Sequence, residues 1–130
     1  ISCPNTENHL INENLDKFLN NEREWCCIKL SPHTELSLVD KYYQQGFRQF
    51  HCCNTLPVKQ GGLSGPSVKG YSLFMIQHFH KYYRNKCEII GGGGIRTLKD
   101  VKDYKEAGAD HVSVSSLFFN PLEMIKLSIY

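Results

Sequence analysis

Hydrophobic side chains along the chain follow two alternating patterns. Apolar positions recur every three or four residues in five segments, which predicts helices at residues 10–23, 35–45, 71–85, 97–107 and 121–128. Short apolar runs between these segments predict buried strands at residues 25–30, 47–53, 88–90 and 111–114. Each strand is thus followed by a helix, and Gly46 and Gly108 supply stop signals for two of the helices.

This alternation predicts an α/β fold with a parallel sheet. Right-handed connections place successive strands side by side and pack the helices against the sheet. In such folds the loops that follow the strands carry the chemistry. The polar stretch Ser2-Cys3-Pro4-Asn5-Thr6 looks like one more loop of this kind. We therefore expect residues 1–130 to form a partial barrel domain that starts at the end of a strand.

The charge of the chain is low and evenly spread. Fifteen Lys and Arg residues oppose thirteen Asp and Glu residues, so the formal net charge is +2. A nucleic-acid partner is not expected, because the basic residues do not cluster as such binding requires. No run of apolar residues reaches the length of a membrane span, and no targeting pattern opens the chain. The sequence predicts a protein without a membrane partner.

The six cysteines do not form a metal or disulfide pattern. Cys26-Cys27 and Cys52-Cys53 are adjacent pairs inside apolar runs, and no C-x-x-C pair occurs. Neighbours on a strand point to opposite faces, so buried thiols are the expected state. Reduced thiols favour a cytoplasmic location. The six histidines show no H-x-x-x-H spacing, and no metal is assigned.

A run of four glycines, Gly91 to Gly94, lies between a predicted strand and a predicted helix. Glycine amides can approach an anion closely, and the helix that starts at Thr97 adds the positive end of its dipole, so the natural ligand is a phosphate. Ser115 and Ser116 offer further donors at the end of the adjacent strand, as in barrel folds that hold a phosphate between two loops. A plain flexible turn is the alternative.

Lys29 interrupts an apolar strand, where an unpaired ammonium is costly. It pairs with a carboxylate, reaches the surface, or stabilises negative charge on a bound cofactor. The stretch from residue 61 to residue 70 is either an ordinary long loop or a functional one. Gly61, Gly62 and Gly65 would let its backbone lie against a flat ligand.

Two uncharged pairs, Asn5-Thr6 and Asn54-Thr55, follow predicted strands. An asparagine offers both donors and an acceptor, so two of them suit a ring edged with amides, such as a pyrimidine. Each pair alone fits a turn equally well. Cys3 lies beside the first pair and is a candidate acid or base, because a thiol titrates near neutral pH in a suitable environment. An inert terminal cysteine is the alternative.

Several linked motifs together resemble dihydroorotate dehydrogenase. They are Ser2-Cys3-Pro4-Asn5-Thr6, Ile28-Lys29-Leu30-Ser31-Pro32, Asn54-Thr55-Leu56, Gly61-Gly62-Leu63-Ser64-Gly65-Pro66, Ile89-Ile90-Gly91-x-Gly93-Gly94-Ile95 and Gly108-Ala109. The match extends over essentially the whole chain. It implies the C-terminal half of a TIM (β/α)8 barrel, made of four parallel βα units from the end of the fourth strand onward.

The resemblance implies FMN as cofactor and the oxidation of dihydroorotate to orotate, the redox step of pyrimidine synthesis. Cys3 resembles the base that removes the C5 proton while hydride passes from C6 to the flavin. Lys29 would lie at the N1–O2 edge of the flavin and stabilise the reduced anion. The remaining contacts divide among substrate, flavin and phosphate. They are Asn5, Asn54 and Thr55 for the substrate, Ser64 and Gly65 for the flavin, and Gly93, Gly94, Ser115 and Ser116 for the phosphate.

The resemblance also bears on partners. Cysteine at position 3 is typical of the soluble members, whereas the membrane-associated, quinone-using branch generally has serine. The motifs KLSP and GGLSGP are most similar to the branch that passes electrons to NAD through an iron–sulfur and FAD subunit, although fumarate-using members also carry the cysteine. We expect the chain to need the N-terminal half of the barrel for activity. A homodimer or an electron-transfer subunit is a further candidate partner.

Two other functions fit part of the pattern. Dihydropyrimidine dehydrogenase is a related flavin barrel that also uses cysteine, but it usually has histidine where this chain has Asn5. A half barrel that binds a phosphate or a partner without turnover would need neither Cys3 nor Lys29. The sequence therefore favours dihydroorotate as the substrate.

Overall fold

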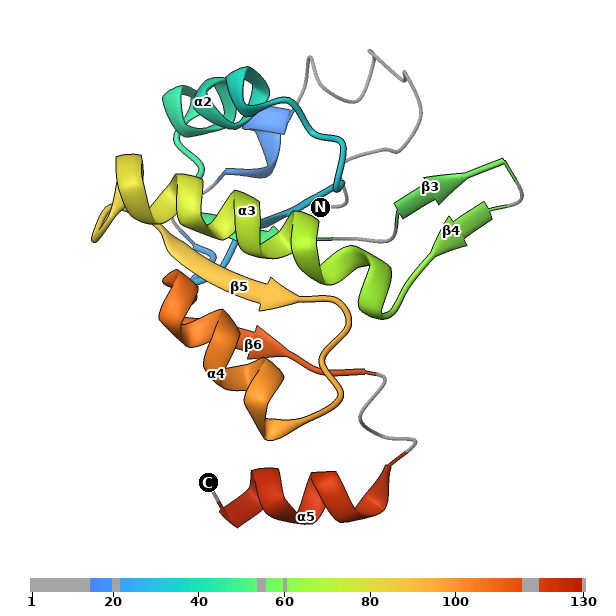
Figure 1. The fold of residues 1–130 in the computed structure, drawn as a ribbon. Coiled ribbons are helices and arrows are strands. Elements are labelled where there is room, and N and C mark those ends of the chain that lie inside the picture. The colour runs from blue at the N-terminus through green and yellow to red at the C-terminus, as the bar shows by residue number, and fades with distance from the viewer. Residues whose placement is uncertain (1–14, 20–21, 54–55, 60, 116–119, 130) are drawn as a thin grey trace.

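The computed structural model of the chain describes residues 15–19, 22–53, 56–59, 61–115 and 120–129. Its main sheet is parallel, with the strand order β1-β2-β5-β6. The strands are β1 Cys27–Leu30, β2 Gln49–Cys52, β5 Glu88–Gly92 and β6 His111–Ser113. The helices are α2 Leu36–Gln45, α3 Pro66–Tyr83, α4 Leu98–Ala107 and α5 Pro121–Ile129 (Figure 1). The predicted α/β class with four parallel βα units is confirmed.

The two faces of the sheet differ in burial, as the strand alternation requires. Ile28 and Leu30 of β1 are buried, whereas Lys29 between them is exposed. On β2, Phe50 and Cys52 are buried and His51 is half-buried. Residues opposite one another in the register share a face, so Ile28 pairs with Phe50 and Lys29 pairs with His51. One face therefore forms the core, and the other carries polar side chains.

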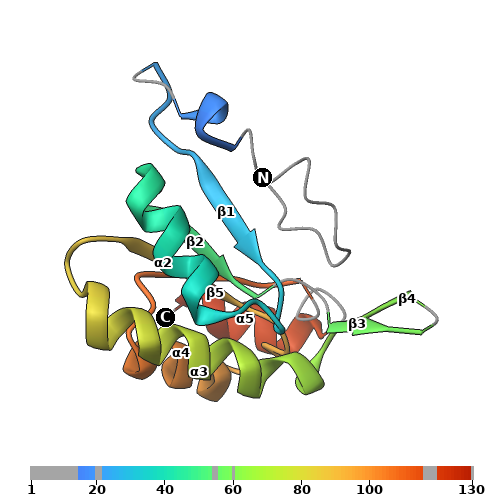
Figure 2. The ribbon, with the colours of Figure 1, turned by 90° about the horizontal axis from the view of Figure 1, so that it is seen from above.

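Helices α2, α3 and α4 supply the other half of the core (Figure 2). Helix α3 packs on β2 and β5, and α4 packs on β6 and on α3. The rings of Phe50 and Phe79 lie 4.8 Å apart, which joins β2 to α3. Tyr42 of α2 and Tyr104 of α4 are also fully buried. The apolar pattern of the sequence thus corresponds to real packing between the sheet and these helices.

The predicted helix ends are confirmed by their caps. Gly46 and Gly108 both adopt φ +113°, the left-handed conformation that favours glycine after a helix. Thr97 caps α4 through a capping box with Asp100. A cap of this kind stabilises a helix by about 1 kcal/mol.

The helix predicted for residues 10–23 is wrong in the part that the structure describes. Only a short 3-10 helix, η1 Leu15–Phe18, occurs there, and Glu22 to Glu24 are not helical. Asn12, Asn14, Asn20 and Asn21 fall in this stretch. Asparagine competes for backbone hydrogen bonds in non-helical conformations, and this weakens a helix whose apolar spacing looks correct.

The connection between β2 and α3 contains more structure than the long loop predicted for it. An antiparallel hairpin occupies it, with β3 Leu56–Val58 paired to β4 Gly61–Leu63. Helix α3 then begins at Pro66 and not at Tyr71. Proline favours the first position of a helix, and the Gly65-Pro66 pair was the available signal for this start. Strand β5 also extends through Gly91 and Gly92, because the parallel register with β6 reaches Gly92.

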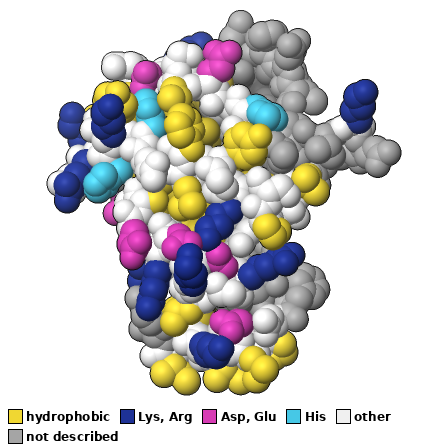
Figure 3. Space-filling model, viewed as in Figure 1, with side chains coloured by type: hydrophobic (Ala, Val, Ile, Leu, Met, Phe, Trp, Pro, Cys, Tyr) yellow, Lys and Arg dark blue, Asp and Glu magenta, His cyan; other side chains and the backbone are white. Residues whose placement is uncertain are grey.

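The surface viewed in Figure 3 mixes basic and acidic side chains over α4, as expected from the even charge pattern. Leu122, Ile125 and Ile129 of α5 are 72%, 57% and 82% exposed, and α5 has no buried residue. Across the described ranges, none of the helices has the length and apolar character needed to cross a membrane.

Candidate functional site

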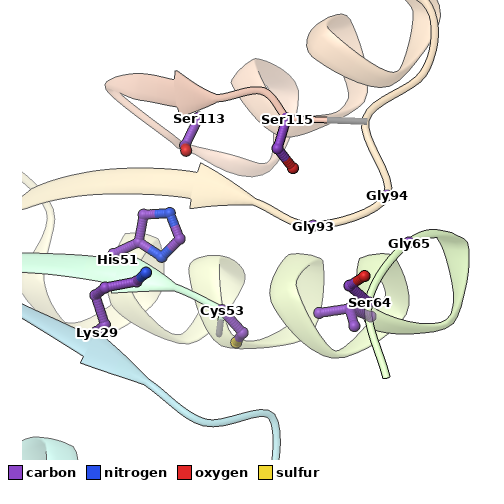
Figure 4. A pocket seen from close by; sticks show the side chains of 10 residues that line it. Lys29, His51, Cys53, Ser64, Gly65, Gly93, Gly94, Ser113 and Ser115 are labelled. Atoms are coloured by element: carbon purple, nitrogen blue, oxygen red, sulfur yellow. The ribbon is translucent and has the colours of Figure 1, made fainter. Parts of the chain in front are cut away.

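A pocket of about 230 Å³ lies at the carboxyl ends of the parallel strands (Figure 4). Each strand of the sheet contributes to it at or just after its last residues, and the junction of β4 with α3 closes another side. The residues that line it are Lys29, His51, Cys53, Ser64, Gly65, Val68, Gly93, Gly94, Ser113 and Ser115. This is the edge of the sheet at which α/β folds place their ligands.

The pocket brings together most of the predicted flavin and phosphate contacts. They are Lys29, Ser64, Gly65, Gly93, Gly94 and Ser115. The predicted base Cys3, the substrate contacts Asn5, Asn54 and Thr55, and the phosphate contact Ser116 lie outside the described residues. The structure therefore places one set of predicted residues side by side and leaves the roles of the other set as predictions.

Glycine is required where the two loops of the pocket meet. Gly94 has φ +70° and Gly65 has φ +91°, in the left-handed region. A Cβ atom on Gly94 would lie 2.8 Å from the carbonyl oxygen of Gly65 and 2.9 Å from Cα of Pro66. The loop after β5 thus packs directly on the start of α3, and any side chain at Gly94 would separate them.

Side chains from two helices hold the carbonyl groups of the glycine run. The Ser72 hydroxyl donates to the Gly92 carbonyl oxygen at 2.7 Å. The Tyr104 hydroxyl lies 2.9 Å from the same oxygen and 2.6 Å from that of Gly93. The backbone N–H of Cys53 also donates to Gly92, at 3.2 Å. Burial raises the pKa of Tyr104 to about 12, so this phenol stays protonated at neutral pH.

The start of α4 is occupied by the chain's own carboxylate. Asp100 accepts hydrogen bonds from the backbone N–H groups of Arg96 and Thr97, at 3.0 and 2.8 Å. Thr97 does not line the pocket. The backbone N–H groups at the start of α4 thus donate to Asp100, and the expectation that this helix directs its dipole at a phosphate stays a prediction. Gly65 at the N-terminus of α3 lines the pocket instead, so α3 is the helix whose positive end faces it.

Lys69 joins α3 to α4 just behind the pocket. Its ammonium lies 2.5 Å from Asp100 and 2.7 Å from Asp103. Partial burial opposes the charge on Lys69, but the hydrogen bonds that its ammonium donates to both carboxylates outweigh this effect and raise the pKa of Lys69. Burial likewise opposes the charge on Asp100, but Lys69 and the donors of Arg96 and Thr97 hold its pKa well below the usual value of 3.8.

Lys29 lies beside His51 on the open face of the sheet (Figure 4). Burial, followed by the positive charge of Lys29, lowers the pKa of His51 below its usual value of 6.5. The imidazole is therefore neutral at pH 7, and the local positive charge comes from Lys29.

The sequence reasoning missed His51, Cys53, Val68 and Ser113. The available signal was strand alternation. The register places His51 opposite Lys29, and it places Ser113 on the same face of β6 as His111, which continues this row of residues. Once Lys29 is assigned to the pocket face, this register assigns its neighbours to the same face. Alternation does not predict Cys53, because it follows β2 and its thiol contacts Met75 in the core.

The donor groups of the pocket fit one end of an anionic, flat ligand such as FMN. Hydroxyl groups, an ammonium, an imidazole and glycine backbone line it, and no carboxylate is among the described residues that do so. Its volume is below the range of about 300 to 1,000 Å³ that is usual for whole-ligand sites. We find no cluster of His, Cys, Asp or Glu suited to a metal ion in the described part of the chain.

Comparison with known proteins places this arrangement in a family. The family model for dihydroorotate dehydrogenase matches residues 1–127. The catalytic subunit of dihydroorotate dehydrogenase B (NAD(+)) from Oceanobacillus iheyensis is 30% identical over 153 aligned positions, which include 98% of this chain and 50% of that protein. A putative dihydroorotate dehydrogenase A (fumarate) from Aquifex aeolicus is 37% identical over 73 residues, covering 55% of this chain and 24% of that protein.

Solved structures agree on the fold. The ferulenol complex of the Eimeria tenella enzyme DHODH matches 78% of this chain and 33% of that chain, with a TM-score of 0.64 and 22% identity. Its ligand-free form matches 82% of this chain and 37% of that chain, with a TM-score of 0.63. The chain spans about half the length of the Oceanobacillus relative and less of the others. Because the family model matches residues 1–127, the chain belongs to the dihydroorotate dehydrogenase family.

Proposed function

We propose that this chain supplies the cofactor-binding half of an FMN-dependent barrel that oxidises dihydroorotate to orotate in pyrimidine synthesis. The observation that carries the proposal is the pocket itself. Lys29, the Ser64-Gly65 turn, the Gly93-Gly94 loop and Ser115 come from separate elements and line one cavity. Family membership alone would not require these residues to meet.

The pocket residues that the sequence predicted each have a role that their chemistry supports. Gly93, Gly94 and Ser115, with Ser116, would hold the phosphate, because glycine backbone admits an anion closely and serine donates to it. Ser64 and Gly65 would contact the flavin. Lys29 would stabilise negative charge at the N1–O2 edge of the ring. When bound, FMN would supply the hydride acceptor for the reaction.

The substrate end of the site is proposed from residues outside the described ranges. Cys3 would remove the C5 proton of dihydroorotate, and its thiol is an effective base only where the surroundings favour the thiolate. Asn5, Asn54 and Thr55 would hold the substrate ring through amide and hydroxyl hydrogen bonds. The motifs that contain these residues fall within the matched range of the family.

We further propose that the active protein contains additional barrel strands. Strands β1 and β6 are the edges of the described sheet, and an open parallel edge presents unpaired backbone groups. The open face carries Lys29 and His51, and α5 exposes Leu122, Ile125 and Ile129. A complementary set of strands and helices would pair both edges and cover these side chains.

Cys26, Cys52, Cys53 and Cys87 are free thiols, which supports action in the reducing cytoplasm. The similarity to the NAD-linked catalytic subunit favours an electron-transfer subunit as a partner, with a fumarate-type acceptor as the alternative. Purification of the natural complex separates the two, because only the first requires a second flavin-bearing subunit.

Titration of the chain with FMN tests the cofactor assignment. Binding should quench flavin fluorescence, and Lys29→Met should weaken it by about ten- to a hundredfold, since a hydrogen bond to a charged group contributes about 1.5 to 3 kcal/mol. Lys41→Met, at an exposed position of α2, is the control. Orotate should then perturb the flavin spectrum of the completed barrel. Equal affinity in the two variants would reject the pocket as the FMN site.

A further inference from the structure

His51 is a side chain of the pocket for which the proposed cofactor site has no role. It lies opposite Lys29 in the parallel register of β1 and β2, and both line the cavity. Figure 4 shows the imidazole ring beside the lysine nitrogen, below Ser113 and facing the same space as Gly93. The two nitrogen-bearing groups therefore meet a ligand from the same side.

The imidazole is closely packed on one edge and unsatisfied on the other. A Cβ atom on Gly92 would lie 2.9 Å from Nε2 of His51, so a side chain at position 92 would displace the ring from this place over β5. Nδ1 is buried and has no hydrogen-bond partner in the described protein. A buried polar atom without a hydrogen-bond partner is unfavourable, which favours a ligand that supplies one.

The charges around His51 are few. From β1 it faces Lys29, and from β5 and β6 it faces the uncharged residues Gly92 and Ser113. Cys53, which follows β2, also lines the pocket, but its thiol lies 3.9 Å from the Met75 sulfur in the core. Burial and the Lys29 charge both lower the pKa of His51. An anion beside Lys29 would oppose this second effect and make the protonated imidazole more favourable.

We propose that His51 is a proton-uptake residue of the pocket: it takes up a proton from solvent when an anionic oxygen of the ligand lies against Lys29. The inference rests on the proposed function, since it takes the ligand to be FMN. The anionic oxygen belongs either to the phosphate or to the N1–O2 edge of the reduced flavin. In both cases neutral imidazole plus a proton becomes imidazolium, and a second positive charge then faces the anion.

Calorimetric titration of the chain with FMN tests this inference. Heats measured in two buffers of different ionisation enthalpy give the number of protons taken up. Wild type should take up a measurable fraction of a proton near pH 7, and His51→Gln, which cannot be protonated, should lose that uptake. His80→Gln, an exposed histidine of α3 away from the pocket, is the matched control. The FMN phosphate can also change its protonation on binding. The difference between His51→Gln and the other two proteins therefore reports only the proton uptake that depends on His51.

The affinity of the chain for FMN should change with pH in one direction. Binding that takes up a proton weakens as pH rises, by at most about tenfold per pH unit between the free and bound pKa values of His51. His51→Gln should show a flatter profile than His80→Gln. FMN binding with equal uptake in wild type and His51→Gln would overturn the inference while leaving the proposed function intact.

Failure of FMN to bind would instead count against the proposed function. NMR titration of the histidines in the free chain still tests the coupling of Lys29 and His51, because Lys29→Met should raise the pKa of His51. Inorganic phosphate then replaces FMN as the probe of binding. An unchanged His51 titration in Lys29→Met would overturn the inference. Proton uptake when oxidised FMN binds identifies the phosphate as the anion beside Lys29. Proton uptake only after reduction of the bound flavin identifies the N1–O2 edge of the ring as that anion.

Discussion

The Tyr104 hydroxyl of helix α4 lies 2.6 Å from the carbonyl oxygen of Gly93, which directly follows strand β5. The ring of Tyr104 is fully buried, and its hydroxyl also reaches the carbonyl oxygen of Gly92. Helix α4 thus fixes the backbone of the loop that faces the pocket, although its own N-terminus is capped by Asp100. Packing of the core and shape of the pocket are therefore coupled through one side chain.

Tyr104→Phe should reduce both stability and ligand affinity. The change removes the hydroxyl but keeps the ring, so the Gly93 carbonyl loses a buried partner, at a cost of about 1 to 2 kcal/mol in the free energy of unfolding. The loosened loop should also weaken FMN binding severalfold. Urea denaturation and flavin fluorescence measure the two effects. Tyr82→Phe, at a ring that is 55% exposed, should change neither; equal behaviour of the two variants would contradict the coupling.

Gly94→Ala should destabilise the chain, whereas Gly70→Ala should not. At Gly94 the backbone has φ +70° and a Cβ would meet the Gly65 carbonyl oxygen at 2.8 Å, so we expect a loss of about 1 to 3 kcal/mol. Gly70 lies within helix α3, and a Cβ atom there would meet no other atom within 4 Å. Alanine at this position should stabilise the helix by about 0.5 to 1 kcal/mol. Thermal unfolding of both variants measures the predicted loss of stability in Gly94→Ala and the predicted gain in Gly70→Ala.

Asp100→Asn should lower stability most at neutral pH. The folded state holds the pKa of Asp100 well below 3.8, so the unfolded chain takes up a proton first as the pH falls. The stabilisation is therefore present above pH 3.8 and declines as the pH falls toward the lower folded value. Urea denaturation at a series of pH values from neutral to acid should show the gap between wild type and variant narrowing with acid. The exposed carboxylate variant Glu106→Gln should show no comparable change, and a gap that widens with acid would refute the assignment.

Cys3→Ala should slow proton removal from dihydroorotate in the completed barrel. Loss of a general base costs about a hundred- to ten-thousandfold in rate. Release of deuterium from substrate labelled at C5 reports this step separately from cofactor binding, which should remain normal. Cys87→Ala, a half-buried cysteine at the opposite end of β5 from the pocket, is the control. Undiminished deuterium release in Cys3→Ala would remove Cys3 from the proposed role.

Much of the architecture was predictable because local patterns carry it. Alternation of Ile28, Lys29 and Leu30 requires a two-faced strand, and Gly46, Thr97 and Gly108 mark helix ends by conformations or hydrogen bonds that few other residues supply as well. The glycine run and Ser115 could be assigned to one rim from strand order alone. Local spacing failed for residues 15–19 and 22–23, the described part of the helix predicted at 10–23, where the apolar period resembles a helix that the asparagines oppose.

Only the tertiary structure decided which groups meet in the pocket and in what state. Sequence alone determined the four strands of the main sheet, the order of the βα units and the motifs of the family, because these depend on neighbours in the chain. It did not determine the hairpin of β3 and β4. The pairing of Lys29 with His51, the reach of Tyr104 to Gly93 and the capture of the α4 N-terminus by Asp100 depend on register and packing between distant segments. These contacts set burial and local charge, and so they determine which pocket groups are neutral, charged or available to a ligand.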